Sequence, residues 1–350
     1  MPKDPLNEVL ITGKRILTCK YGENGYQVPA ALYCTGTDDP LSIDKFKLIS
    51  GTEPSYNNLC DMDRLLQTIT HISASFDKNR ARVPLIAVGV KHGNPCGAAV
   101  GDDPRDVAKK MILGDPLAIF GGLIMTNFEV SEDIAEIFIT EGMPEGVRRP
   151  LDGILAPSFS ETAIGAFHRK GDKCRLFVNQ KLEKLNLSGL DLAPRFRYVR
   201  GGFLLQPNYT YILDLNDPEL KRYGSATKEQ EDDMLLAKSI CDTSNSNTIT
   251  IVKNGQLLSN GVGQQARVLG ARLAVNLAGY TGHDTEGSVV SSDSFFPFPD
   301  AVEVLKDAGV RAIIATSGSI RDKEVIGYCE KNSIVLYHIP DSKGRGFFGH

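Results

Sequence analysis

Continuous apolar runs along the chain predict a series of buried strands. The clearest is VPLIAVGV at residues 83–90, which carries no charged side chain. Further strands are predicted at residues 123–126, 151–157, 248–252, 310–315 and 334–338. Short runs of this kind, rich in β-branched residues, are typical of strands inside a sheet.

Segments with helical spacing of apolar residues lie between these strands. The first follows SYNNLCDMD (residues 55–63), where Asn57 and Asn58 could cap the helix or bind a ligand, capping being the default. Its apolar positions are Leu65, Leu66, Ile69, Ile72 and Phe76. Pro104 after two acids opens another helix, and Thr227 with Gln230 forms a plausible capping box. Later helices are predicted after Arg267 and at residues 301–308 and 322–330.

Strands and helices alternate in both halves of the chain. This alternation predicts an α/β protein made of two similar layered units. We place their boundary near Ser225, so that the units span residues 1–224 and 225–350. No repeat with one of the common short periods is visible.

Composition narrows the functional classes. The 350 residues are 41% hydrophobic and 23% charged, with a net charge of −4, so no basic excess favours nucleic acid or anionic lipid. No apolar run approaches the roughly 20 residues of a membrane span. The cysteines are odd in number and form no C-x-x-C pair, which indicates reduced thiols in a cytoplasm.

The first candidate for chemistry is the stretch KHGNPCG, residues 91–97, at the end of the predicted strand. Lys91 can neutralise a developing oxyanion, and His92 can move a proton near neutral pH. Pro95 and Gly97 predict a sharp turn after them. For Lys91 and His92 alone, a solvated strand end is the favoured interpretation, since single charged strand ends are common.

Several glycine-rich and aromatic loops are further candidates. Paired glycines follow Phe120 and could let a ligand approach the backbone or mark a bulge. GVGQQAR at residues 261–267 resembles an anion cradle but lacks the Gly-Lys-Ser/Thr of a P-loop. SSDSFFPFPD at residues 291–300 predicts a rigid aromatic loop that would suit a flat heterocycle, although core-filling loops use the same residues.

Taken in order, these stretches resemble the transformylase part of bifunctional purine biosynthesis enzymes, the AICAR transformylase family. AICAR is 5-aminoimidazole-4-carboxamide ribonucleotide. The resemblance covers essentially residues 18–350. Its motifs are KYGENGYQ, SYNNLCDMD, KHGNPCG, AIFGG, ILAPSFSE, VRGGFLLQ, SNT, GVGQQAR, SSDSFFPF, SGSIRDKEVI and FFGH. Each motif is weak alone, but the ordered set is highly specific.

The resemblance implies a fold, a reaction and partners. It implies two cytidine-deaminase-like α/β subdomains with mixed sheets and a homodimer with shared active sites. The expected reaction transfers a formyl group from 10-formyltetrahydrofolate to AICAR. Because the first motif begins at Lys20, we expect a stand-alone transformylase that lacks the IMP cyclohydrolase domain and leaves ring closure to a separate protein.

Site residues follow from the same resemblance. Lys91 and His92 would serve the oxyanion and the proton transfer, and Asn247 would position the formyl group. The residues implied to contact AICAR are Lys20, Tyr21, Asn58, Gly121, Asp152, Arg267, Phe348 and His350. Those implied to line the folate side are Phe120, Phe295, Phe298, Asp300 and Ser319. A structural potassium ion near Ser246 and Asp293 is a further implication, with no catalytic metal.

Three departures from the family pattern concern the phosphate end of the nucleotide. Lys20 stands where the family usually has Arg, and residues 24–27 read NGYQ where it has NPHQ. Gly346 stands where the family has an Arg two residues before Phe348, and Arg345 lies one position earlier. The segment after residue 334 is also longer, with Pro340 and Gly344 inserted. A lysine keeps the charge but loses the bidentate geometry of a guanidinium.

The same residues allow two other functions to be considered for this chain. A zinc deaminase needs H-x-E and P-C-x-x-C, but this chain has His92-Gly93-Asn94 and a single Cys96, so a zinc-bound water lacks ligands. A non-catalytic relative that binds a purine nucleotide is the more credible alternative because of the altered phosphate end.

Overall fold

The computed structural model describes residues 8–169 and 171–349. The helices are α1 (Tyr56–Arg80), α2 (Pro104–Gly114), α3 (Glu132–Thr140), α4 (Glu161–Ala166), α5 (Lys228–Asp242), α6 (Arg267–Tyr280), α7 (Asp300–Asp307), α8 (Asp322–Lys331) and α9 (Asp341–Gly344). The strands of the first half are β1 (Lys14–Cys19), β2 (Ala30–Cys34), β3 (Lys47–Ser50), β4 (Leu85–Lys91), β5 (Asn94–Gly101), β6 (Leu123–Thr126), β7 (Gly153–Ala156), β8 (Arg175–Val178), β9 (Arg195–Val199), β10 (Gly202–Gln206) and β11 (Lys221–Tyr223). The later strands are β12 (Ile249–Lys253), β13 (Gln256–Gly261), β14 (Val289–Ser292), β15 (Ala312–Ser317) and β16 (Val335–Pro340).

The elements predicted from apolar patterns are confirmed, with small shifts of their ends. Strand β6 has the predicted bounds, and the helix predicted from Thr227 is α5, whose capping box is present. Helix α1 begins earlier than predicted, at Tyr56, because Ser55 and Asn58 form a reciprocal capping box. Asn58 therefore lies inside the helix rather than in a loop ahead of it.

The sharp turn predicted at Pro95 and Gly97 is wrong. The chain reverses at His92-Gly93, and residues 94–101 form strand β5, which pairs antiparallel with β4 from Lys91↔Asn94 onwards. Pro95 is tolerated in this strand because the register shifts between Gly89 and Val90, which leaves Cys96 as an extra residue in a bulge.

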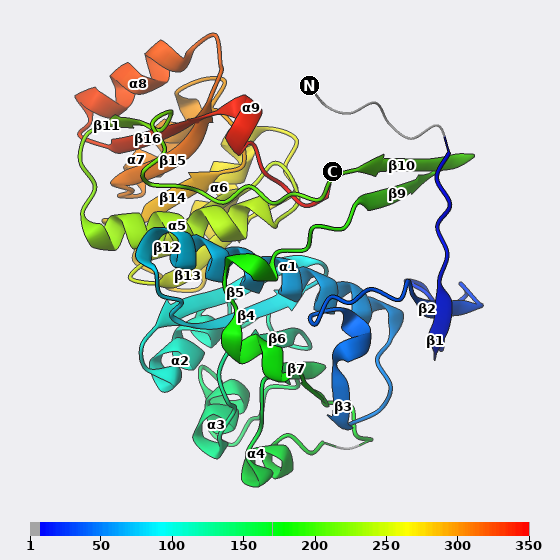
Figure 1. Ribbon diagram of the computed structural model, residues 1–350. Helices are drawn as coiled ribbons and strands as arrows, with labels where there is room; N and C mark the ends of the chain where they lie inside the picture. The colour runs from blue at the N-terminus through cyan, green and yellow to red at the C-terminus, as the bar shows by residue number, and fades with distance from the viewer. Residues whose placement is uncertain (1–7, 170, 350) are drawn as a thin grey trace.

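One large mixed sheet organises the molecule. Its strand order is β11-β16-β15-β14-β12-β13-β5-β4-β6-β7-β8-β3. Strands β5 and β13 meet in its middle as antiparallel neighbours, with Ala99 opposite Gln256. The prediction of an α/β protein with mixed sheets is thus confirmed, but the two halves share one sheet (Figure 1).

The two halves of this sheet repeat one order of elements. In the first half, α1 leads into the hairpin β4–β5, followed by α2, β6, α3, β7, α4 and β8. In the second half, α5 leads into the hairpin β12–β13, followed by α6, β14, α7, β15, α8 and β16. In each half the first hairpin strand pairs antiparallel with the third strand, and the last three strands are parallel.

Helices cover both faces of the sheet, which gives three layers. Helices α1 and α5 lie side by side on one face and share a core with strand residues such as Ile86, Val88 and Val252. The opposite face is covered by α2–α4 in the first half and by α6–α8 in the second. Successive strand residues point to opposite faces, so Ala87 contacts the α2–α4 layer while Ile86 faces α1.

Two ribbons stand apart from the main sheet. Strands β1 and β2 form one, and β9 and β10 form the other, which projects from the body beside the C-terminal tail (Figure 1). The seven cysteines are all unpaired. Within residues 8–169 and 171–349, no helix combines the length and apolar character needed to cross a membrane.

Candidate active site

The hairpin turn between β4 and β5 presents Lys91 and His92. His92 (φ 52°) and Gly93 (φ 71°) both adopt left-handed backbone conformations, as a two-residue type I′ turn requires. Asp61 on α1 accepts a hydrogen bond from the Gly93 amide at 2.7 Å, which ties the turn to the helix. His92 is exposed at the tip, while Lys91 is half-buried.

Lys91 lies against a loop that carries several predicted residues. Its Nζ donates to the Phe120 carbonyl at 2.6 Å, and the ring of Phe120 is 47% exposed. Gly121 follows with φ 75°, a conformation that favours glycine. The loop is held to the next segment because the Gly121 amide donates to the Pro150 carbonyl and the Asp152 amide donates to the Gly122 carbonyl.

Asn58 joins this group from α1. Its Oδ1 accepts from the Ser55 amide in the capping box, and its Nδ2 reaches Asp152 Oδ2 at 3.5 Å. Asn58 therefore caps the helix and also lies beside Asp152. The structure thus brings together five predicted residues from four segments: Asn58, Lys91, Phe120, Gly121 and Asp152.

A second group of predicted residues surrounds Arg267, the first residue of α6. Its guanidinium donates to Asn247 Oδ1 at 2.6 Å and to Ser292 Oγ at 2.7 Å, and it forms an ion pair with Asp293. Asp293 is fully buried and also accepts from Ser246 Oγ at 2.5 Å. Asn247 Nδ2 donates to the carbonyls of Gln264 and Gln265, so its amide hydrogens are engaged.

This second group opens into a cavity of about 540 Å³ with aromatic walls. Asn247, Arg267, Phe295, Phe298 and Asp300 all line it. Arg345 lies over the Phe295 ring and Arg321 over the Phe298 ring, at 5.6 and 4.8 Å from the ring centres. The neighbouring Phe296 is instead buried in the core, so the aromatic loop serves both of the roles considered for it.

The C-terminal tail folds back onto this region. Phe348 is buried between the guanidinium groups of Arg64 and Arg195, which lie 4.4 and 3.4 Å from its ring centre. Its carbonyl accepts from Arg64 Nη2 at 2.6 Å, and its amide donates to the Ser244 carbonyl. Burial lowers the pKa of Arg64 to about 10, so this guanidinium remains charged at neutral pH. Arg345 and Phe347 line the cavity.

The structure gives a physical reason for the departure at Gly346. A Cβ at this position would collide with the Tyr209 hydroxyl and the Asp242 carboxylate, so no side chain fits. The guanidinium at this end of the chain is therefore carried by Arg345, which pairs with Asp341.

The two groups are joined by hydrogen bonds between the halves. The Asn245 amide donates to Asn94 Oδ1 at 3.2 Å, which connects the loop before Asn247 to the start of β5. Asn245 Oδ1 in turn accepts from Arg64 Nη2 at 3.1 Å. Asn94, Asn245 and Arg64 were not predicted; only the position of Asn94 just after a His-Gly turn could have indicated its place.

Other predicted residues lie outside both groups. Lys20 and Tyr21 are exposed after β1, in a loop whose Glu23 carbonyl accepts from Asn57 of α1 at 3.4 Å. Ser319 precedes α8, where its amide donates to Asp322 Oδ1, and it is absent from the described lining of the aromatic cavity. His350 lies outside the described residues.

Two places in the structure bear on metal binding, Asp293 and Cys96. Each carboxylate oxygen of Asp293 already has one partner, Arg267 for one and Ser246 for the other, and a potassium ion at this place stays a prediction. In the described ranges no three His, Cys, Asp or Glu side chains are grouped to hold a metal ion. Burial raises the pKa of the Cys96 thiol to about 12, which disfavours the thiolate that zinc or nucleophilic chemistry would need.

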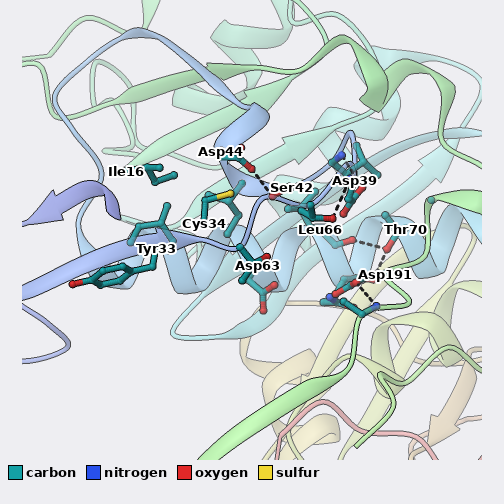
Figure 2. A pocket seen from close by; sticks show the side chains of 18 residues that line it. Ile16, Tyr33, Cys34, Asp39, Ser42, Asp44, Asp63, Leu66, Thr70 and Asp191 are labelled. Carbon is teal, nitrogen blue, oxygen red and sulfur yellow. Dashed lines mark hydrogen bonds between the residues drawn. The ribbon is translucent and has the colours of Figure 1, made fainter. Parts of the chain in front are cut away.

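A separate acidic cavity lies along the outer side of α1, between β2 and the segment around Asp191. Figure 2 shows the carboxylates of Asp39, Asp44, Asp63 and Asp191 around it, with Cys34 and Thr70. Asp39 and Asp44 already accept hydrogen bonds from Leu41 and Ser42. None of the predicted site residues that the structure describes belongs to this lining, so the cavity is not the candidate active site.

The fold and the two groups define a mixed α/β protein with a polar and aromatic candidate site for a small molecule. Comparison with known proteins is more specific. The model of the AICARFT/IMPCHase bienzyme family matches residues 2–277, and the chain belongs to this family.

Curated relatives carry the description bifunctional purine biosynthesis protein PurH. The protein of Anoxybacillus flavithermus is 34% identical over 321 residues, which cover 91% of this chain and 57% of the relative. The Aquifex aeolicus protein is 31% identical over 92% of this chain and 58% of its own length. For Rhodopirellula baltica the identity is 33%, over 96% of this chain and 60% of the relative. This chain therefore spans somewhat over half the length of the relatives it matches.

Proposed function

We propose that this protein transfers the formyl group of 10-formyltetrahydrofolate to the 5-amino group of AICAR, giving FAICAR and tetrahydrofolate. Family membership supports a purine biosynthesis role. The observation that carries the proposal is the hairpin turn that presents Lys91 and His92 beside Phe120, Gly121 and Asp152. By resemblance, Phe120 belongs to the folate side, whereas Gly121 and Asp152 belong to the AICAR side.

The reaction needs a proton acceptor and a stabilised oxyanion. The amine nitrogen attacks the formyl carbon, the bond from that carbon to the folate nitrogen breaks, and the folate nitrogen takes up a proton. His92, exposed at the turn, accepts the amine proton. Lys91 is held by the Phe120 carbonyl through one of its hydrogens, so two remain to stabilise the oxyanion.

Asn247 has a more restricted role than the resemblance implied. Both donors of its amide are used by the carbonyls of Gln264 and Gln265, while Oδ1 accepts from Arg267. An amide oxygen has two lone pairs, so acceptor capacity remains. We propose that Asn247 accepts from the substrate amine and orients it, because it has no donor left for the formyl oxygen.

The aromatic cavity is proposed as the folate side. Phe295 and Phe298 offer ring surfaces, and Asp300 at the start of α7 offers a carboxylate. For AICAR we retain Lys20, Tyr21, Asn58, Gly121, Asp152, Arg267, Phe348 and His350 as proposed contacts. The exposed positions of Lys20 and Tyr21 make them the most accessible of these to direct test.

The oligomeric state and the division into subdomains are also proposals. We propose a cytoplasmic homodimer with shared active sites. We further propose that residues 1–224 and 225–350 are cytidine-deaminase-like subdomains. The repeated order of helices and strands in the two halves supports this last point.

One assay tests the reaction. The purified protein is incubated with AICAR and 10-formyltetrahydrofolate, and tetrahydrofolate release is followed. Turnover is the expected result. Tight AICAR binding without turnover would instead support a non-catalytic nucleotide-binding relative. Stoichiometric zinc in the purified protein would support the zinc deaminase hypothesis.

A further inference from the structure

A buried ion pair on α5 lies directly beneath the C-terminal tail. Lys238 is 1% exposed and Asp242 is 2% exposed, and they form an ion pair one helical turn apart. Burial raises the pKa of Asp242 to about 6, so the carboxylate remains mostly ionised at neutral pH. Burying two charges is costly unless their remaining hydrogen-bonding groups are satisfied.

Lys238 and Asp242 each make a further hydrogen bond, one to the tail and one to a residue beside it. Lys238 Nζ donates to the Gly344 carbonyl at 2.8 Å, at the end of α9. Asp242 Oδ2 accepts from the Tyr209 hydroxyl at 2.8 Å. Gly346 then passes so close to Asp242 and Tyr209 that a Cβ would collide with both.

The same tail segment continues into the candidate active site. The Gly346 amide donates to the Asp293 carbonyl at 3.1 Å, and the Asp293 side chain pairs with Arg267. Arg345 and Phe347, on either side of Gly346, line the aromatic cavity. They also line a second cavity beside the hairpin β9–β10, so they form the wall between the two.

We propose that Lys238, together with Asp242 and Tyr209, is a positioning cluster that fixes the tail so that Arg345 and Phe347 form one wall of the substrate site. The cluster acts through the tail and touches no substrate. The Lys238 ammonium group holds the Gly344 carbonyl, and Tyr209 and Asp242 pack closely against Gly346. Together these contacts restrict the tail to one path. The effect on substrate binding rests on the proposed function, whereas the effect on the tail does not.

The test separates tail position from general stability. Lys238→Met leaves Asp242 unpaired, so the informative variant is Lys238→Met with Asp242→Asn, which removes both charges and keeps an acceptor for Tyr209. Asp233→Asn is the matched control, because Asp233 is also a buried carboxylate on α5 but accepts from the Asn254 and Gly255 amides. All variants are full-length, and carboxypeptidase digestion measures tail release without substrate.

We expect the double variant to lose its C-terminal residues about 10- to 100-fold faster than the wild type, the range expected from losing a charged hydrogen bond. The Asp233→Asn control is expected to lose them at the wild-type rate. Equal digestion of wild type and double variant, or equal acceleration in the control, would overturn the proposal.

Kinetics provide a second readout. KM for AICAR or folate is expected to rise in the double variant with a smaller change in kcat. The same double substitution should add little in an Arg345→Ala, Phe347→Ala background, because the affected side chains are already gone. An undiminished effect in that background would show that the cluster is only structural. Absence of turnover in the wild type would defeat the proposed reaction, while the digestion assay would still decide this inference.

A steric variant covers the case in which the charge variant does not fold. Gly346→Ala should also release the tail, because its Cβ meets the Tyr209 hydroxyl and the Asp242 carboxylate. Gly279→Ala is the control, because a Cβ at that position meets open space and digestion should stay at the wild-type rate. Digestion of Gly346→Ala at the wild-type rate would contradict the proposed close packing around Gly346.

Discussion

The hairpins β4–β5 and β12–β13 occupy the same place in the two halves and are built alike. Each turns at a two-residue loop with left-handed backbones, His92-Gly93 at φ 52° and 71°, and Asn254-Gly255 at φ 53° and 71°. Each turn is tied down by an aspartate of the preceding helix, since Asp61 accepts from Gly93 and Asp233 accepts from Gly255, both at 2.7 Å.

The likeness extends to the register. Lys91 opposite Asn94 matches Lys253 opposite Gln256, and each hairpin has a bulge directly after its second pair. The extra residue is Cys96 in the first hairpin and Leu258 in the second. The backbone is therefore repeated down to its irregularities.

The difference lies in the side chains at the turn. Asn-Gly is the pair preferred by a type I′ turn, whereas histidine gives the turn no such advantage. Lys253 pairs with the exposed Asp284, but Lys91 donates to the Phe120 carbonyl beside Gly121. The comparison teaches that the scaffold is repeated while the Lys-His pair occurs in one copy, which supports a functional reason for His92.

The largest expected effect comes from giving the first turn the residue of the second. His92→Asn keeps a residue suited to the turn but removes the proton acceptor. We expect kcat to fall by on the order of 10²–10⁴-fold, with AICAR binding and melting temperature preserved. Steady-state kinetics and thermal melting measure the two effects.

The reciprocal change, Asn254→His, is the control. It should leave kcat at the wild-type value, because this turn lies away from the grouped site residues. A His92→Asn enzyme with wild-type kcat would remove the imidazole from the mechanism and erase the proposed difference between the hairpins.

The lysines allow a second exchange. Lys91→Met should lower kcat by about 10²–10³-fold if the ammonium stabilises charge present only in the transition state. Lys253→Met removes an exposed ion pair and should leave the melting temperature almost unchanged, with no kinetic effect. Loss of activity in both variants would mean that Lys91 has no special role.

The sequence predicted the strand that ends at Lys91 but misplaced the turn after it. Pro95 and Gly97 are turn-forming residues by type, yet here one lies beside a bulge and the other lies where a Cβ would collide with the Met111 carbonyl of α2. A glycine required for close packing cannot be told from a turn glycine without the tertiary structure.

Residue patterns also do not predict contacts between segments that are far apart in the sequence. The joining of the halves into one sheet depends on β5 meeting β13, and no local pattern specifies that pairing. The site residues came from the ordered motifs, since nothing in their spacing places Asn58 beside Asp152. The capping boxes at Ser55 and Thr227 are a local sign of the repeated order, besides the alternation of strands and helices.

The tail supplies a prediction of intermediate size. The last strand of the second half leads into α9 and the returning tail, where Phe348 is held by Arg64 and Arg195. Deleting residues 347–350 should lower kcat/KM by about 10- to 100-fold, since a wall of the site is lost, while the melting temperature falls by only a few degrees. Wild-type kinetics in the truncated protein would show that the site is complete without the tail.

The smallest effect is expected at Cys96. Its thiol lies near the turn and could be taken for a nucleophile. Formyl transfer to an amine needs no acyl-enzyme, and burial raises the pKa of this thiol to about 12, so the thiolate is scarce at neutral pH. The Sγ atom lies 3.6 Å from the Gly89 carbonyl, a contact that a serine hydroxyl can replace. Leu258, the bulge residue of the second hairpin, shows that this position needs no thiol to hold its backbone. Cys96→Ser should therefore keep kcat within about threefold of the wild type, roughly 0.7 kcal/mol in the barrier. A folded but inactive Cys96→Ser enzyme alongside an active His92→Asn enzyme would transfer the chemistry from the turn to the bulge.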